Sequence, residues 1–313
     1  MFRFTSVSSV SAIALALALA ACSPAESPAP ETAAAETAET TAPAIAESAD
    51  VKPFTVGDLQ GAALKDNDFY PPNDNSVLAI HQTHAEVDPV LEAAGLDTDK
   101  LHLSVQPMLI ETADKVFLFD TGTGPGGSGK ATASLEAAGV APADVDDIFI
   151  SHYHFDHVGG LLTAEGALAF PNATIHISAP EWAFMQSSED QAALVAAIAD
   201  KVETFEPGAE IVPGAVQAVE IKGHTPGHTG FMVTSGDASL LYIGDAMHHS
   251  VISVQEPDWT IAYDSEPETA QESRKIVLAE AADSGQRVYA VHFPFPGLGK
   301  FERKDDGFVW VAE

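Results

Sequence analysis

The feature that most constrains the fold is the segment 151–157, which reads Ser-His-Tyr-His-Phe-Asp-His. It begins where the apolar run 147–151 ends, and that run predicts a buried strand. In an extended chain, side chains two residues apart face the same side, so His152 and His154 can approach one point together. The aspartate continues this alternation, whereas His157 falls out of phase. The chain must therefore turn here, and the glycines that follow permit it.

Imidazole and carboxylate groups are the ligands that zinc and similar divalent ions accept. Three more of these residues stand at the ends of predicted strands or in turns beside glycine. An aspartate has two carboxylate oxygens, so seven ligands with one shared aspartate give four contacts to each of two ions. A lone histidine or aspartate is usually structural, but four within six residues rarely arise by chance. We predict two divalent ions, with zinc preferred, bound by His152, His154, Asp156, His157, His228, Asp245 and His292.

Three nearby polar residues receive other roles. Asp120 ends a predicted strand and is expected to hydrogen-bond a ligating histidine from behind, which would fix its tautomer. The alternative for Asp120 is a turn that ends the strand. His224 lies in the sequence Gly-His-Thr-Pro-Gly-His, four residues before His228, and is expected to be structural. His248 is expected close to Asp245 without binding a metal ion.

Short apolar runs alternate with helical patterns along the rest of the chain. This mixture predicts an α/β protein in which helices pack on the faces of sheets. The expected helices are 130–138, one that begins near Pro180, 190–203 and 267–283, and the expected strands are 115–119, 147–151, 174–177, 218–221, 230–233, 239–243 and 288–291.

The N-terminal segment has the pattern of an export signal. Arg3 precedes an apolar stretch that is too short to span a bilayer. The sequence Leu-Ala-Ala-Cys at 19–22 resembles a bacterial lipobox, so residues 1–21 are expected to be a lipoprotein signal peptide and Cys22 the lipidated residue. Residues 22–50 lack aromatic and basic residues and predict a disordered tether, with the folded domain at 51–313. We therefore expect an exported protein that is lipid-anchored to a bacterial membrane on its periplasmic or outer side.

Charge and cysteine content restrict the partners and the ligands. The formal net charge is −32, which opposes binding to nucleic acids and anionic membrane surfaces. The sequence has one cysteine, which excludes an internal disulfide and leaves the domain without a thiolate ligand. The charge argues against a nucleic-acid substrate, and a small, neutral or weakly charged molecule is expected instead.

The string at 152–157 resembles the H-x-H-x-D-H signature of the metallo-β-lactamase superfamily, and the similarity spans roughly residues 54–313. It includes Asp120-Thr121-Gly122 and the segments around the other predicted ligands. The resemblance implies a four-layer αββα sandwich of two mixed sheets flanked by helices. It also implies that His152, His154 and His228 bind one metal ion, that Asp156, His157 and His292 bind the other, and that Asp245 bridges them.

Segments 244–248, 259–264 and 292–297 resemble the branch that contains methyl parathion hydrolase and quorum-quenching lactonases. This implies hydrolysis of an ester-like bond, in a lactone, an aryl ester or a phosphotriester, by a hydroxide that bridges the metals. Asp156 would orient the nucleophile or carry the proton, and Asp245 would hold both ions. The alternatives are a β-lactamase, a glyoxalase-type thioesterase, or a non-catalytic lipoprotein stabilised by its metals.

Overall fold

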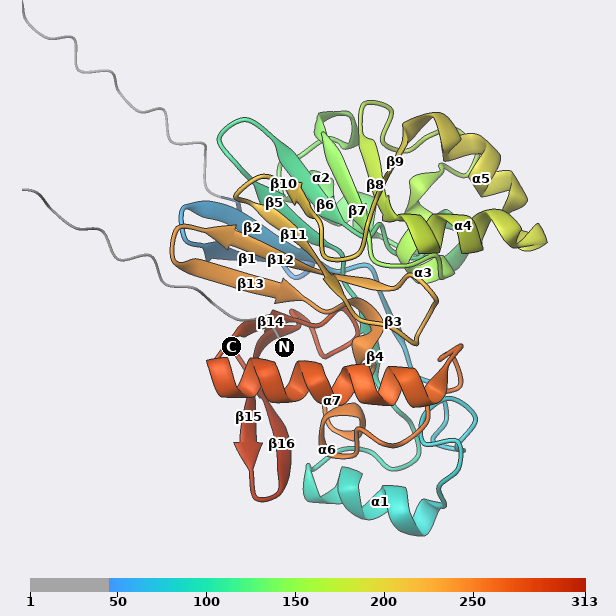
Figure 1. Cartoon of the computed structure of the whole chain (residues 1–313), viewed down its shortest axis with the longest axis vertical. Coiled ribbons are helices and arrows are strands. Elements are labelled where there is room, and N and C mark those ends of the chain that lie inside the picture. The colour runs from blue at the N-terminus through green and yellow to red at the C-terminus, as the bar shows by residue number, and fades with distance from the viewer. Residues whose placement is uncertain (1–44) are drawn as a thin grey trace, which may run out of the picture. The chain divides into compact units, whose positions relative to one another are not determined.

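The computed structural model describes residues 45–313, and Figure 1 shows two large sheets with helices around them. The predicted signal peptide at 1–21, the lipidation site Cys22 and most of the predicted tether lie outside the described residues, and they stay predictions. Among residues 45–313, no helix combines the length and apolar character needed to cross a membrane.

Residues 45–50 lie against the domain, although the sequence assigned them to the tether. Ile45 packs against the apolar cluster beneath the first sheet. The backbone N–H of Lys65 donates to the carbonyl of Asp50 at 2.8 Å. The structure therefore moves the start of the domain from Val51 to no later than Ile45, because this isoleucine has an apolar surface to cover.

The first sheet is mixed and contains seven strands. Its antiparallel part comes first, and β6, β7, β8 and β9 then run parallel to one another. The order is β1 (Val51–Val56), β2 (Leu59–Leu64), β5 (Met108–Glu111), β6 (Val116–Phe119), β7 (Asp147–Ile150), β8 (Thr174–Ser178) and β9 (Val202–Phe205).

The second sheet is also mixed and seven-stranded, with β13 and β14 as its parallel pair. A separate pair, β3 (Asn67–Phe69) and β4 (Leu103–Val105), is antiparallel. The order of the second sheet is β10 (Glu210–Val212), β11 (Val216–Glu220), β12 (Thr229–Ser235), β13 (Ala238–Tyr242), β14 (Arg287–Tyr289), β15 (Leu298–Lys304) and β16 (Gly307–Ala312).

Helices cover the outer faces of the two sheets, as Figure 1 shows for α4 beside β8 and for α7 beside β15. Their bounds are α1 (His84–Ala93), α2 (Ala131–Ala137), α3 (Phe155–Val158), α4 (Ala179–Ser187), α5 (Ala192–Ile198), α6 (Ile252–Gln255) and α7 (Pro267–Ser284).

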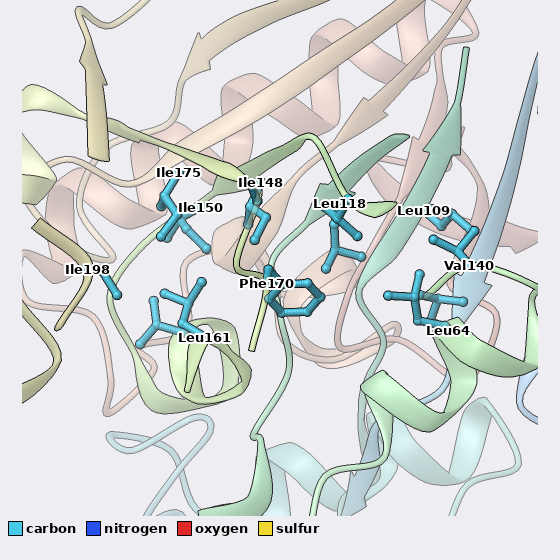
Figure 2. Packing of buried hydrophobic residues seen from close by; sticks show 14 of the residues in the cluster. Leu64, Leu109, Leu118, Val140, Ile148, Ile150, Leu161, Phe170, Ile175 and Ile198 are labelled. Carbon is cyan, nitrogen blue, oxygen red and sulfur yellow. The ribbon is translucent and has the colours of Figure 1, made fainter. Parts of the chain in front are cut away.

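Alternating side chains divide the core into three layers. In β6, Leu118 faces the helices in the cluster drawn in Figure 2, whereas Phe117 and Phe119 pack between the sheets. In the second sheet, Tyr242 joins the layer between the sheets, and Leu241 packs towards α7. Two sheets packed face to face with helices outside both give the predicted αββα sandwich.

Chain direction brings five strand ends to one edge. Strands β6 and β7 are parallel in the first sheet, and β11, β13 and β14 share one direction in the second. Each of these strands is followed by polar residues. The carboxyl ends of both sheets can therefore supply side chains to a single site.

Candidate metal centre

Three histidines form the first ligand group. The Nε2 atom of His152 lies 3.0 Å from Nδ1 of His154 and 3.2 Å from Nε2 of His224. The last two nitrogens are 3.0 Å apart, so the three atoms form a nearly equilateral triangle. His152 and His154 come from the loop after β7, and His224 comes from the loop after β11.

A second group contains Asp156, His157 and His292. Oδ2 of Asp156 lies 3.7 Å from Nε2 of His157 and 3.5 Å from Nε2 of His292. Asp156 and His157 lie in the short helix α3, and His292 follows β14 from the other sheet. The two sheets thus contribute jointly to this group.

Asp245 faces both groups, one carboxylate oxygen to each. Its Oδ2 lies 3.2 Å from Nε2 of His224 and 3.6 Å from Nε2 of His152. Its Oδ1 lies 3.1 Å from Nε2 of His157 and 3.0 Å from Nε2 of His292. This is the geometry expected of a carboxylate that bridges two cations.

The backbone before Asp245 depends on Gly244, which has a φ of 49°. A Cβ atom there would lie 2.6 Å from Nε2 of His228 and 3.0 Å from Cβ of Ser151. Only glycine fits both this conformation and this space. The turn that places Asp245 between the two groups therefore requires Gly244.

The side chains fit divalent metal ions in spacing and in unsatisfied polar atoms. A tetrahedral ion with ligands at about 2.0–2.1 Å separates its ligand atoms by about 3.3–3.4 Å, close to the distances above. Within the described part of the chain, buried Nε2 of His157, Nε2 of His292 and Oδ1 of Asp245 have no hydrogen-bond partner. Buried polar atoms rarely stay unpaired, so cations bound among them would satisfy this site.

The surroundings of several of these groups shift their pKa values towards the protonation state that binds metal ions. Burial and the neighbouring His224 lower the pKa of His154 to about 3, and burial with His157 lowers the pKa of His152 well below its usual 6.5. Burial opposes ionisation of Asp245, but His157 and His292 hold its pKa well below 3.8. Neutral imidazoles and an ionised carboxylate are the forms that bind metal ions.

The pKa of His224 is shifted in the opposite direction. Burial lowers its pKa, but hydrogen bonds and charges from Asp245 and Asp264 outweigh burial and raise this pKa to about 9. A histidine with this pKa carries a proton on each ring nitrogen at neutral pH. Binding of a cation at Nε2 therefore requires release of that proton, which couples metal binding to pH.

The structure corrects the predicted roles of His224 and His228. His228 lies outside the first group, because both of its ring nitrogens contact the backbone. Its Nδ1 donates to the carbonyl of Ile221 at 2.8 Å, and its Nε2 accepts from the N–H of Asp245 at 2.8 Å. His224, which we predicted to be structural, supplies the third nitrogen. Both histidines flank the same Pro-Gly turn, and residue type and spacing alone do not distinguish them.

The structure places Asp120 behind His157, as predicted. Its Oδ2 lies 2.7 Å from Nδ1 of His157, and the carboxylate also accepts from Ser151 and from the hydroxyl of Tyr242. Asp120 has a φ of 57°, a conformation that is costly for a residue with a Cβ atom. The hydrogen bonds offset that cost and direct Nε2 of His157 towards Asp245.

His248 lies directly beside Asp245. Its Nε2 is 3.0 Å from Oδ2 of Asp245, and its ring stacks on that of His292 with centroids 5.2 Å apart. Its Nδ1 is buried without a hydrogen-bond partner among the described residues. Asp245, His248 and His292 therefore form a third set of atoms with metal-binding spacing.

Glu181, which the sequence analysis did not single out, holds two ligand-bearing loops together. This fully buried carboxylate accepts from the N–H of Tyr153 at 2.9 Å, from the hydroxyl of Thr225 at 2.8 Å and from the N–H of Gly227 at 2.9 Å. Burial raises its pKa, although these donors act in the opposite direction. Glu181 therefore joins the loop of His152 to the loop of His224.

Replacing Glu181 with glutamine should lower the free energy of unfolding by about 1–3 kcal/mol, because one amide group cannot accept all three hydrogen bonds. Urea unfolding of the metal-free protein measures this effect. The control is Glu189→Gln, which changes an exposed carboxyl group just beyond the same helix. Equal stability of the two variants would contradict the role of Glu181.

Two mixed sheets flanked by helices carry a buried His and Asp cluster with metal-binding spacing at their shared edge. Residues 103–292 match the family model described as the metallo-beta-lactamase superfamily. The chain belongs to this superfamily, which confirms the predicted family and fold.

Among solved structures, the chain is similar to AidC, a dizinc quorum-quenching lactonase in complex with a product, N-hexanoyl-L-homoserine. The TM-score is 0.79 at 30% identity, and the match covers 84% of this chain and 97% of that one. It is also similar to the hydrolase AbOPH of the beta-lactamase superfamily, with a TM-score of 0.78, 26% identity and coverage of 86% and 99%.

Curated relatives match over shorter stretches. A probable metallo-hydrolase of Mycobacterium bovis is 26% identical over 187 residues, which are 45% of this chain and 56% of that protein. An N-acyl homoserine lactonase of a Bacillus species is 35% identical over 115 residues, which are 36% of this chain and 43% of that protein. The chain thus spans about half the length of these relatives.

Proposed function

We propose that this protein is a dinuclear zinc hydrolase that opens lactones, N-acyl homoserine lactones among them. The observation that carries the proposal is the position of Asp245, whose two oxygens each face a separate ligand group. One shared carboxylate keeps two cations close enough to act on the same substrate. The lactonases among the relatives support the substrate class.

Two adjacent divalent ions lower the pKa of a water molecule towards neutrality and stabilise the oxygens of attack and departure. Within the chain, Asp245 holds the two ligand groups at a fixed separation. Asp156 is partly exposed, unlike the buried His157 and His292. Its carboxylate can therefore face the substrate, orient the attacking water and accept or return its proton.

Aromatic side chains beside the centre supply an apolar surface for the substrate. Phe155, between two ligands, is 57% exposed, and its ring meets that of Phe69 edge-on at 6.2 Å. Tyr263 is half exposed and lies 6.2 Å from the ring of His248. Phe293 directly follows the ligand-type residue His292 but is fully buried in the core. Apolar side chains beside a polar centre suit an ester with a hydrocarbon chain.

A substrate panel tests the proposal. It contains homoserine lactones with short and long acyl chains, an aryl ester, an aryl phosphotriester and a cephalosporin. We expect a kcat/KM of about 10⁴ M⁻¹s⁻¹ or more for a lactone, lower values for the others, loss on chelation and recovery with zinc. Faster cleavage of the phosphotriester or cephalosporin would reject the substrate class. Two bound metals without any hydrolysis would favour the non-catalytic alternative.

A further inference from the structure

We propose that Arg274 and Asp264 are positioning residues of the metal centre, through which helix α7 orients His224 and holds the turn that carries Asp245. The proposal rests on the proposed metal-dependent function. Asp264 lies in the segment 259–264, to which the sequence analysis gave no role in the site.

The Arg274 side chain is buried at a position where packing alone does not require a charged residue. It lies in the middle of α7 with no exposed surface, on the side of the helix that also buries Ala270, Val277 and Leu278. An aliphatic residue would fill this position without taking a charge out of water, which is costly unless the charge is fully paired. A retained guanidinium therefore indicates a role for its hydrogen bonds.

Those hydrogen bonds reach two segments near the centre, the turn that contains Ala246 and the loop between α6 and α7. Nε donates to the carbonyl of Ala246 at 2.9 Å, and Nη1 donates to the carbonyls of Pro257 at 2.9 Å and Trp259 at 3.3 Å. Nη2 donates to Oδ2 of Asp264 at 3.0 Å. The planar guanidinium fixes these acceptors relative to one another.

Asp264 contacts His224 as well as Arg274, so it links the two side chains. Its side chain is fully buried, and its Oδ1 lies 2.9 Å from Nδ1 of His224. A proton on Nδ1 leaves Nε2 as the atom that faces His152 and His154. A carboxylate behind a ligating histidine fixes both the tautomer and the orientation of the ring.

Ala246 gives the same guanidinium a second point of contact with the site. It directly follows Asp245, so the bond from Arg274 restrains the turn from its C-terminal side. His228 restrains the N–H of Asp245 from the other side. Arg274 thus links the position of His224 to that of the shared carboxylate.

The two ligand groups differ in the charge behind their histidines. His157 is paired with Asp120, whose other partners are the neutral groups of Ser151 and Tyr242. His224 is paired with Asp264, whose charge Arg274 balances. Less negative charge near the first group attracts a cation less strongly. We therefore expect the ion beside His224 to leave first under a chelator.

The test replaces the buried pair with apolar residues in the double variant Asp264→Leu/Arg274→Met. Such replacements often preserve stability, whereas removal of one partner leaves a buried charge unpaired. Metals per chain are measured after dialysis against graded chelator, together with thermal unfolding of the metal-free protein. We expect stability close to the wild type, about 10–100-fold weaker binding of the ion beside His224 and a smaller effect on the other ion, which Asp245 also faces.

A matched control changes another Arg–Asp pair, whose aspartate lies on the same helix. Arg303 and Asp283 form an exposed ion pair between α7 and β15, and Asp283→Leu/Arg303→Met should leave both metals bound. If the buried double variant does not fold, Asp264→Asn keeps the size of the side chain. It should weaken the same ion and change the absorption spectrum of the cobalt-substituted protein.

The outcomes distinguish this inference from the proposed function. A wild-type protein that binds no metal overturns both. A wild-type protein with two ions, together with buried-pair variants that hold both ions as tightly and give the wild-type cobalt spectrum, overturns the positioning role alone. Weaker binding of one ion in the buried-pair variants, with the exposed pair unaffected, supports it.

Discussion

Replacing Asp245 with alanine should remove both metal ions and lower kcat/KM for the best substrate by more than about 10³-fold. The reason is that the two oxygens of this carboxylate lie 3.0–3.2 Å from His292, His157 and His224, which belong to different ligand groups. The variant also loses the negative charge between several histidines. Metal content by mass spectrometry and single-substrate kinetics measure the two effects.

Asp237→Ala is the matched control, because it removes an exposed carboxyl group from the turn between β12 and β13. It should retain two ions per chain and wild-type turnover. If Asp245→Ala also keeps two tightly bound ions, the bridging role is wrong. Loss of one ion only would show that Asp245 serves a single group.

The layered fold could be predicted because its strands are buried and bounded by turns. The apolar run 115–119 corresponds to β6, and the helix predicted at 267–283 corresponds to α7 (Pro267–Ser284). The predicted helix at 190–203 is partly wrong, because α5 ends at Ile198 and β9 begins at Val202. Alanine favours a helix locally, but pairing with β8 decides the conformation of the last residues.

The hairpin of β15 and β16 was not predicted from the sequence. β15 ends in the charged run 302–304, and β16 is held at the edge of the sheet by a single neighbouring strand. Such strands form because a partner strand is present, which local patterns do not report. The same limit applies to Glu181 and Arg274, whose partners lie far away in the sequence.

Within the candidate metal centre, residue spacing predicted the ligand-type side chains that the segment 152–157 supplies. All four residues of the string at 152–157 lie in groups with metal-binding spacing, but the alternation holds only for His152 and His154, because Asp156 lies with His157 in helix α3. The choice between His224 and His228 depends instead on the loop between β11 and β12. There the ring of His228 turns towards the backbone of Ile221 and Asp245, which no pattern in the sequence specifies.

Alanine at position 224 and alanine at position 228 should therefore have different consequences. His224→Ala removes one corner of the nitrogen triangle with His152 and His154. We expect loss of one metal ion and a fall in kcat/KM of at least about 10²-fold, beyond the 10–100-fold typical of groups behind the ligands. Metal analysis and kinetics on the same preparations provide the comparison.

His228→Ala should mainly lower stability, by about 1–3 kcal/mol, because it leaves the buried carbonyl of Ile221 and N–H of Asp245 without their partner. It should keep two metal ions, with turnover reduced less than in His224→Ala. The reverse pattern, in which only His228→Ala loses an ion, would restore the ligand assignment that the resemblance implied. The pair of variants thus decides which histidine completes the group, since both remove the same ring from the same loop.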